Sequence, residues 1–169
     1  MSAPKPSVAV VMGVSGSGKT TIARALAEAW PASFLDADDF HSPQARAHMA
    51  SGRPLTDEMR LPWVERIAAE LQRRVAAGER VALAFSGLRR RHRDMLRETG
   101  LPLRFVFLHG GRELIATRMG ERVGHYMPVA LLDSQFAALE PPAGEDDVHA
   151  IDVRLPPARV LVQALAALS

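Results

Sequence analysis

The sequence contains no cysteine, so it can form neither a disulfide bond nor a thiolate metal site. It also lacks an uninterrupted apolar run of the roughly 18 residues that a membrane-spanning helix needs. The N-terminus, MSAPKPSVAV, has neither the charged start nor the long apolar stretch of a signal peptide. We therefore expect a cytoplasmic protein that does not enter a membrane.

Lysine and aromatic residues are also scarce. Lys5 and Lys19 are the two lysines among 21 basic residues, aromatic residues make up 5% of the chain, and the net charge is only +2. Proteins that bind nucleic acid usually carry a basic stripe with aromatic residues beside it. We therefore expect no nucleic-acid partner. The run RRRHR at 89–93 is interpreted as a solvated helix start with one or two residues facing an anionic pocket.

Short apolar runs alternate with segments of helical periodicity along the 169 residues. The apolar runs predict strands at residues 7–12, 33–36, 81–86, 103–109 and 148–153. The periodic segments predict helices at residues 19–30, 61–77, 112–122, 128–139 and 158–168, with Pro62 in a first turn. This alternation indicates a single α/β domain over residues 1–169, with a mostly parallel five-stranded sheet and helices on both faces.

A glycine-rich stretch, GVSGSGKTT, lies between the first predicted strand and the first predicted helix, and fits the pattern G-x-x-x-x-G-K-[ST] at every position. Glycines let successive backbone N–H groups point inward at a phosphate, and the following helix adds the positive end of its dipole. A glycine- and serine-rich connector is the structural alternative. The strand before the stretch and the helix after it favour a phosphate-binding loop.

This loop predicts a site for a nucleoside triphosphate and Mg²⁺, in which Lys19 reaches the β- and γ-phosphates and the Thr20 hydroxyl is a metal ligand. The residues expected to bind the nucleotide are Gly13, Val14, Ser15, Gly16, Ser17, Gly18, Lys19, Thr20 and Thr21. Kinases, GTP switches and motors share such a loop. The chain lacks the guanine-reading N-K-x-D segment of a GTP switch and is short for a motor, which favours a small-molecule kinase.

Two carboxylates follow the second predicted strand, in the stretch FLDADDFH. In a sheet of this kind that strand ends beside the phosphate loop. A kinase needs one carboxylate to accept the proton of the attacking hydroxyl and another to hold Mg²⁺ through water. We assign the first role to Asp38 and the second to Asp36. Solvated loop acids, or a helix cap at Asp39, are the structural alternatives.

His41 and Arg60 are candidates for binding the phosphate acceptor. His41 can donate a hydrogen bond to a hydroxyl or a carboxylate, although a lone loop histidine is often only structural. Arg60 can clamp an anionic acceptor, because a guanidinium group matches a carboxylate in a bidentate way. It can equally pair with Asp57 across a helix start, and the sequence leaves both interpretations of Arg60 open.

Six segments together resemble gluconokinase, the ATP-dependent gluconate kinase family: GVSGSGKTT, FLDADDFH, MASGRPLTDEMRLPW, SGLRRRHRDMLR, RxxxRxGHY and QFxxLEPP. The resemblance runs without gaps over most of the chain, from about Val8 to the final helix. It implies a three-layer P-loop kinase fold like that of nucleoside-monophosphate kinases, more distantly related to shikimate kinase, with a helical lid at about 112–128. It also implies a homodimer, and transfer of the γ-phosphate of ATP to the 6-hydroxyl of D-gluconate.

The resemblance also implies roles for individual residues on the acceptor side. Asp38 and His41 match the family segment G-D-x-x-H-P, and Arg60 matches the arginine of D-R-x-P-W. Ser86, Leu88 and Arg89 match S-A-L-K, where a basic residue faces the active site. These matches imply that Asp38, His41, Arg60 and Arg89 bind the substrate.

Arg118, Arg122, Gly124 and His125 match the lid segment R-x-x-x-R-x-G-H-F. Arg118 and Arg122 are four residues apart and share one face of a helix. Two cations there would stabilise the transferring phosphoryl group, and one could stack on adenine. The match implies a nucleotide-binding Arg118, a catalytic Arg122 and a substrate-binding His125. An exposed helix face, with these arginines paired to Glu113 or Glu121, is the structural alternative.

Some positions depart from the family pattern: Ala37 replaces glycine, Ser42 proline, Ala45 asparagine, Gly87 alanine, Arg89 lysine and Tyr126 phenylalanine. Arginine is longer than lysine and planar, so that exchange is not neutral at a close contact. Three alternatives to a gluconate kinase stay open: a kinase for shikimate or another hydroxylated acid, a nucleotide kinase, and a nucleotide-binding sensor without catalysis.

Overall fold

The computed structural model describes residues 5–121 and 129–169, with side chains for 5–118 and 132–169. In these residues, five strands form one sheet: β1 (Val8–Met12), β2 (Ser33–Asp36), β3 (Val81–Ala84), β4 (Leu103–His109) and β5 (Val148–Asp152). The strand order is β2-β3-β1-β4-β5. Every pairing between neighbours is parallel, so all the strands end at the same edge of the sheet. The predicted α/β class and the central parallel sheet are confirmed.

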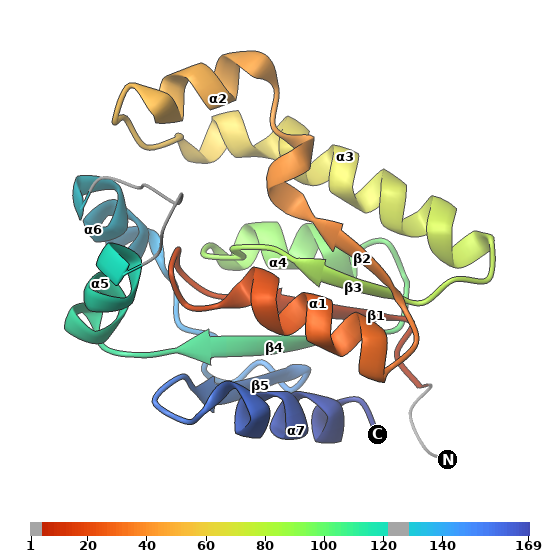
Figure 1. Ribbon diagram of the computed structural model, residues 1–169. Helices are drawn as coiled ribbons and strands as arrows, with labels where there is room; N and C mark the ends of the chain where they lie inside the picture. Colours follow the sequence, from red (N-terminus) through yellow and green to blue (C-terminus); the bar gives the residue numbers. More distant parts are fainter. Residues whose placement is uncertain (1–4, 122–128) are drawn as a thin grey trace.

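Helices cover both faces of this sheet (Figure 1). On one face, α3 (Asp57–Ala76) and α4 (Arg90–Arg97) pack on the side chains of Val8, Val10 and Met12. On the other face, α1 (Lys19–Ala29) and α7 (Pro157–Ala167) pack on Ala9 and Val11. All five residues of β1 are buried, because a central parallel strand has helices on both sides.

The remaining helices lie beyond the carboxyl ends of the strands. A short 3₁₀ turn, η1 (Ala37–Phe40), and α2 (Pro43–Ala50) follow β2, and α5 (Arg112–Glu121) and α6 (Val129–Ala138) follow β4. Figure 1 shows α2 on one side of the loop after β1 and the pair α5 and α6 on the other. Ile115 and Leu132 pack against Val14 and Leu88, which joins α5 and α6 to the loops at the ends of β1 and β3.

The third helix, α3, begins four residues earlier than the sequence predicted. We expected it to begin at Leu61 with Pro62 in its first turn, but α3 begins at Asp57 and holds Pro62 inside it. The Thr56 side chain caps this start by accepting a hydrogen bond from the Met59 N–H at 3.1 Å. The acidic residues that follow the cap favour the same start, because they face the positive end of the helix dipole.

Two helices were not predicted as separate elements. Helix α2 occupies what we expected to be a polar loop, with Ser42 as its cap and Pro43 in its first turn. Helix α4 begins within the arginine-rich run, so the interpretation of this run as a helix start is confirmed, but its solvation does not extend to His92 and Arg93. Both are buried, and the Arg93 side chain is 0% exposed.

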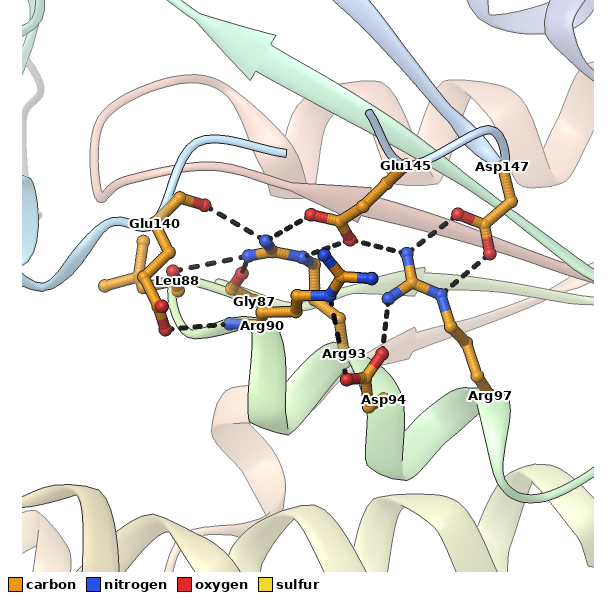
Figure 2. A network of polar contacts seen from close by, with 9 residues as sticks. All are labelled: Gly87, Leu88, Arg90, Arg93, Asp94, Arg97, Glu140, Glu145 and Asp147. Carbon is orange, nitrogen blue, oxygen red and sulfur yellow. Dashed lines mark hydrogen bonds and ion pairs between the residues drawn. The ribbon is translucent and has the colours of Figure 1, made fainter. Parts of the chain in front are cut away.

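Arg93 is buried because its guanidinium group is fully engaged (Figure 2). It forms a bidentate ion pair with Glu145, with N–O distances of 3.0 and 2.6 Å. It also donates to the carbonyl oxygens of Gly87 at 2.6 Å, Leu88 at 3.3 Å and Glu140 at 3.0 Å. One side chain thus joins the loop after β3 to the segment that follows α6.

Arg97 extends the same network by binding Glu145, Asp147 and Asp94 (Figure 2). Hydrogen bonding to Asp147 and Glu145 raises the pKa of Arg97. Burial would raise the pKa of Glu145, but the hydrogen bonds from Arg93 and Arg97 outweigh burial and lower it. Glu145 is therefore ionised, as a buried carboxylate is when it has charged partners.

Candidate active site

The glycine-rich loop takes the shape that a phosphate requires. A Cβ atom on Gly13 would lie 2.6 Å from the carbonyl oxygen of Leu108 and 2.8 Å from the Ser17 hydroxyl, so no larger residue fits there. Gly18 caps α1 with a φ of 97°, a conformation that glycine adopts without strain. The Lys19 ammonium group donates to the Val14 carbonyl at 3.1 Å, which places its charge over the loop.

A cavity of about 260 Å³ lies between this loop and the ends of β2 and β3. Its lining includes Lys19, Thr20, Asp36 and Asp38. The residues predicted to bind the nucleotide and the metal therefore lie in the same cavity as the two predicted acidic residues. Among the described residues no group of three or more His, Cys, Asp or Glu side chains could hold a metal ion by itself. Thr20 and Asp36 both present oxygen atoms to this cavity, and Mg²⁺ usually binds through one or two carboxylates, water and substrate phosphates.

Asp36 has a structural contact as well as a place in this cavity. Its carboxylate accepts a hydrogen bond from the Asp38 N–H at 2.9 Å and so caps η1. The cap that we considered at Asp39 is therefore made by Asp36. Burial raises the pKa of Asp36, and the negative charges of Asp38 and Asp39 act in the same direction.

The Asp38 side chain lines the cavity beside the phosphate loop and is 82% exposed. His41 Nε2 lies 3.7 Å from Asp38 Oδ1. The interaction with His41 lowers the pKa of Asp38, and the positive charge of Lys19 lowers it further. Asp38 is thus an ionised carboxylate at neutral pH, and it is accessible to a substrate.

The position of the His41 ring is fixed by Trp63. This ring stacks on Trp63, with centroids 4.3 Å apart and an interplanar angle of 16°. The Trp63 indole donates to the Ala37 carbonyl at 2.7 Å, which ties the stack to the turn that carries Asp38. The His41 side chain is only 6% exposed, and its Nδ1 has no hydrogen-bond partner among the described residues. His41 therefore supports Asp38 through Nε2, while its Nδ1 is buried.

A second cavity of about 270 Å³ adjoins the first. Both are lined by the same four residues, Ser15, Lys19, Asp38 and Ser86. The second cavity is also lined by His41, Arg46, Met49, Leu55, Arg60, Trp63, Leu88 and Gln135. Asp38 and Lys19 thus stand where a phosphate cavity meets a cavity large enough for a small acceptor.

The sequence did not single out Arg46, Met49, Leu55 or Gln135 as site residues. Arg46 lies on α2, which was expected to be a loop, and it donates to the Asp38 carbonyl at 3.0 Å. The signal for this helix was the serine cap followed by proline. Gln135 belongs to the QFxxLEPP segment, whose presence was noted without a role.

The contact of Arg60 with Asp57 is confirmed, and its role in binding an anionic acceptor stays a prediction. Its guanidinium group lies 3.6 Å from Asp57 and also lines the acceptor cavity, with 13% of the side chain exposed. Burial lowers the pKa of Arg60, and the nearby Arg89 adds to this effect. Arg89 donates to the same Asp57 carboxylate at 3.3 Å. Arg89 lines a neighbouring pocket together with Asp57 and Glu140. It does not line either of the two cavities that Asp38 lines.

A third cavity, of about 290 Å³, lies on the other side of the phosphate loop. Gly18, Thr21 and Arg118 line it together with an apolar wall of Val153, Leu155, Pro157 and Val160. A cavity of this kind suits a flat apolar ring that stacks on the guanidinium group of Arg118. Arg122 and His125 lie outside the described residues.

Comparisons with known proteins point to one family. A family described as an AAA domain matches residues 8–142. The chain is 44% identical to the thermosensitive gluconokinase of Escherichia coli (strain K12) over 145 residues, 85% of this chain and 78% of that one. It superposes on the crystal structure of a gluconokinase from Sinorhizobium meliloti 1021 with a TM-score of 0.88, 44% identity, and coverage of 98% and 93% of the two chains.

A shikimate kinase from Aquifex aeolicus superposes with a TM-score of 0.58 at 16% identity, over 95% of each chain, which shows a common fold only. The phosphate loop, the acidic residues after β2 and the high identity over most of the chain agree with each other. This chain belongs to the gluconokinase family, within the nucleotide-binding proteins described as AAA domains.

Proposed function

We propose that this protein transfers the γ-phosphoryl group of ATP to the 6-hydroxyl of D-gluconate, with Asp38 as the proton acceptor. Membership of the gluconokinase family establishes the enzyme class, a sugar-acid kinase that uses ATP. The observation that supports these residue roles is the shared wall of the two cavities. Asp38 and Lys19 line both of them, so a phosphate in one cavity and a hydroxyl in the other would meet beside these side chains.

The oxygen of the 6-hydroxyl group would attack the γ-phosphorus while Asp38 accepts the proton of that hydroxyl group. ADP would leave with the bridging oxygen. The lowered pKa keeps Asp38 ionised and makes it a weak base. A weak base suffices because positioning and charge stabilisation provide most of the catalysis in phosphoryl transfer. Lys19 places its positive charge where the β- and γ-phosphates would lie.

The acceptor cavity suits a hydroxylated acid. Arg60 and Arg46 supply positive charge for a carboxylate, and His41 and Ser86 supply polar atoms for hydroxyl groups. Trp63 and Leu55 provide apolar walls that would contact the carbon chain. Since gluconate is a six-carbon chain of hydroxyl groups with one carboxylate, this lining provides a partner for each kind of group.

Thr20 and Asp36 are the residues that fit Mg²⁺, because both line the phosphate cavity and both present oxygen atoms. When bound, Mg²⁺ neutralises charge on the phosphates. Adenine would occupy the third cavity, beside Arg118 and the apolar wall that begins at Val153. Arg122, from the same lid segment, is proposed to stabilise the transferring phosphoryl group.

The test is ADP release from Mg·ATP with a panel of acceptors: D-gluconate, shikimate, related sugar acids, glycerate and AMP. We expect turnover with gluconate and little with the others, and Lys19→Ala serves as the inactive control. Turnover with a different acceptor would overturn the substrate assignment. Near-normal turnover of Lys19→Ala would overturn the assignment of the phosphate loop.

We propose a homodimer from the family resemblance, and a cytoplasmic location from the features of the sequence. Light scattering after size exclusion tests the first, with an expected mass of twice the 18.4 kDa chain. A mass of one chain would overturn it. Among residues 5–121 and 129–169 no helix is both long and apolar enough to cross a bilayer.

A further inference from the structure

The last turn of α6 is fixed to the core of the molecule. The Glu140 N–H donates to the Leu88 carbonyl at 2.7 Å, and its own carbonyl accepts from the buried Arg93 at 3.0 Å (Figure 2). The Glu140 carboxylate accepts from the Arg90 N–H at 3.1 Å. Leu139 packs in the cluster of Val14 and Leu88. The QFxxLEPP segment is therefore anchored where α6 ends.

Gln135 lies one helical turn before this anchor and reaches the phosphate loop. Its side-chain Oε1 accepts a hydrogen bond from the Ser15 N–H at 2.6 Å, across 120 positions of sequence. The same side chain lines the acceptor cavity together with Lys19 and Asp38. Gln135 is thus at the junction of the phosphate loop and the acceptor cavity.

Ser15 belongs to the glycine-rich loop and lines the cavity beside Lys19 and Thr20. Backbone N–H groups of a glycine-rich loop hold the phosphates of the nucleotide. A backbone N–H is a single donor, so the Gln135 carbonyl oxygen and a phosphate oxygen compete for it. A phosphate oxygen that took this donor would release Gln135 from it, while the helix would stay anchored at Glu140.

We propose that Gln135 is an acceptor-binding residue that ATP releases from Ser15 to bind a hydroxyl group of the sugar acid. This inference rests on the proposed function. A carboxamide group both donates and accepts hydrogen bonds, as does a hydroxyl group, so the two are complementary. It is also neutral and does not repel the γ-phosphate. A nucleotide with a γ-phosphate would thereby raise the affinity of the enzyme for the sugar acid.

The experiment compares Gln135→Leu with the wild-type enzyme. Leucine occupies similar space but makes no hydrogen bond. Gluconate affinity is measured by calorimetry without nucleotide, with Mg·ADP and with a non-hydrolysable Mg·ATP analogue. In the wild type we expect gluconate to bind about tenfold more tightly with the ATP analogue than with ADP, the effect of one hydrogen bond. In Gln135→Leu we expect this difference to vanish and the KM for gluconate to rise about tenfold, with kcat changed far less.

Gln163→Leu is the matched control, because Gln163 lies on α7 with an exposed side chain. It should behave as the wild type. An unchanged KM and unchanged coupling in Gln135→Leu would overturn the inference. If wild-type enzyme phosphorylates gluconate and only this result fails, the proposed function stands; if the wild type does not phosphorylate gluconate, the proposed function fails first.

Gln135→Glu tests the position of the side chain independently and keeps the shape of glutamine. Its carboxylate retains an acceptor for the Ser15 N–H but places a negative charge beside the γ-phosphate position. We expect affinity for ATP to fall about tenfold more than affinity for ADP, because ADP lacks that phosphate. Equal losses for ATP and ADP, or no loss, would show that Gln135 does not lie at the γ-phosphate.

Discussion

Several carboxylates among the described residues are each shared by two arginines, and two of these carboxylates, Glu145 and Asp57, differ in burial. Glu145 is 3% exposed and is held by Arg93 and Arg97, where Asp94 and Asp147 supply further negative charge. Asp57 is 39% exposed and is shared by Arg60 and Arg89 on the wall of a cavity. Within the Asp57 cluster of described residues, two guanidinium groups contact one carboxylate, so Asp57 neutralises them only in part.

The difference in burial separates a cluster that supports the fold, at Glu145, from a cluster that is open to a ligand, at Asp57. The Glu145 side chain is enclosed, its network has no excess of positive charge, and Arg93 in it fixes the backbone of Gly87, Leu88 and Glu140 (Figure 2). The Asp57 cluster is more open, and there one carboxylate contacts two guanidinium groups. Asp38 has a histidine beside its carboxylate, and Arg46 contacts only its backbone carbonyl in the described residues. This arrangement is consistent with the proton-accepting role proposed for Asp38.

The largest expected effect is on stability, from Arg93→Met. Removing Arg93 leaves the buried Glu145 carboxylate without one of its two guanidinium partners, and breaking such a pair costs about 3–5 kcal/mol. Urea denaturation should show this loss in the free energy of unfolding. The double variant with Glu145→Leu should recover much of it, because the buried charge is gone. A loss below about 1 kcal/mol, the size of a surface pair, would remove the distinction between the two clusters.

The next effect is on catalysis, from Asp38→Asn. Asparagine keeps the size of the side chain but cannot take the proton of the acceptor hydroxyl. We expect kcat to fall by about 100-fold or more, with a much smaller change in ATP affinity. Steady-state kinetics and nucleotide titration give both quantities. A kcat within about tenfold of the wild type, a barrier change near 1.4 kcal/mol, would show that Asp38 is not the base.

A smaller effect is expected on acceptor binding, from Arg60→Met. Losing a charged hydrogen bond to the acceptor carboxylate should raise the KM for gluconate by about 10- to 100-fold. Arg89→Met is the matched variant, because Arg89 shares Asp57 but lines the neighbouring pocket. It should raise the KM much less. Equal increases for the two variants would mean that the cluster acts as one unit and that lining the cavity does not distinguish Arg60.

These clusters also show how much the sequence could reveal. The phosphate loop and the strands were predictable because their signals are local: glycine at fixed spacing and short apolar runs. The start of α3 and the whole of α2 carried local signals too, at Thr56 and Ser42, which we did not use. The burial of Arg93 had no local signal, since its partner Glu145 lies 52 positions away.

The site was predictable in the same measure. Lys19, Asp38, His41 and Arg60 could be named because they fall in compact motifs, and they meet at the two cavities. Gln135 could be noticed but not placed, because its contact with Ser15 depends on how α6 packs. Arg89 matched a motif by position, yet its side chain turns to Asp57, a direction that depends on the packing of α4 against α3.

The smallest effect concerns the pH dependence of stability at Glu145. Its pKa in the folded protein is lowered from an ordinary value of 4.5, so the stability that it contributes is complete above that pH and is lost as the pH falls through the lower folded value. Glu145→Gln removes this ionisation while keeping the shape of the side chain. Urea denaturation over a pH series should therefore show that the stability difference between wild type and Glu145→Gln narrows below about pH 4.5. A difference that stays constant with pH would mean that the charge of Glu145 does not stabilise the fold, and the contrast with Asp57 would then rest on burial alone.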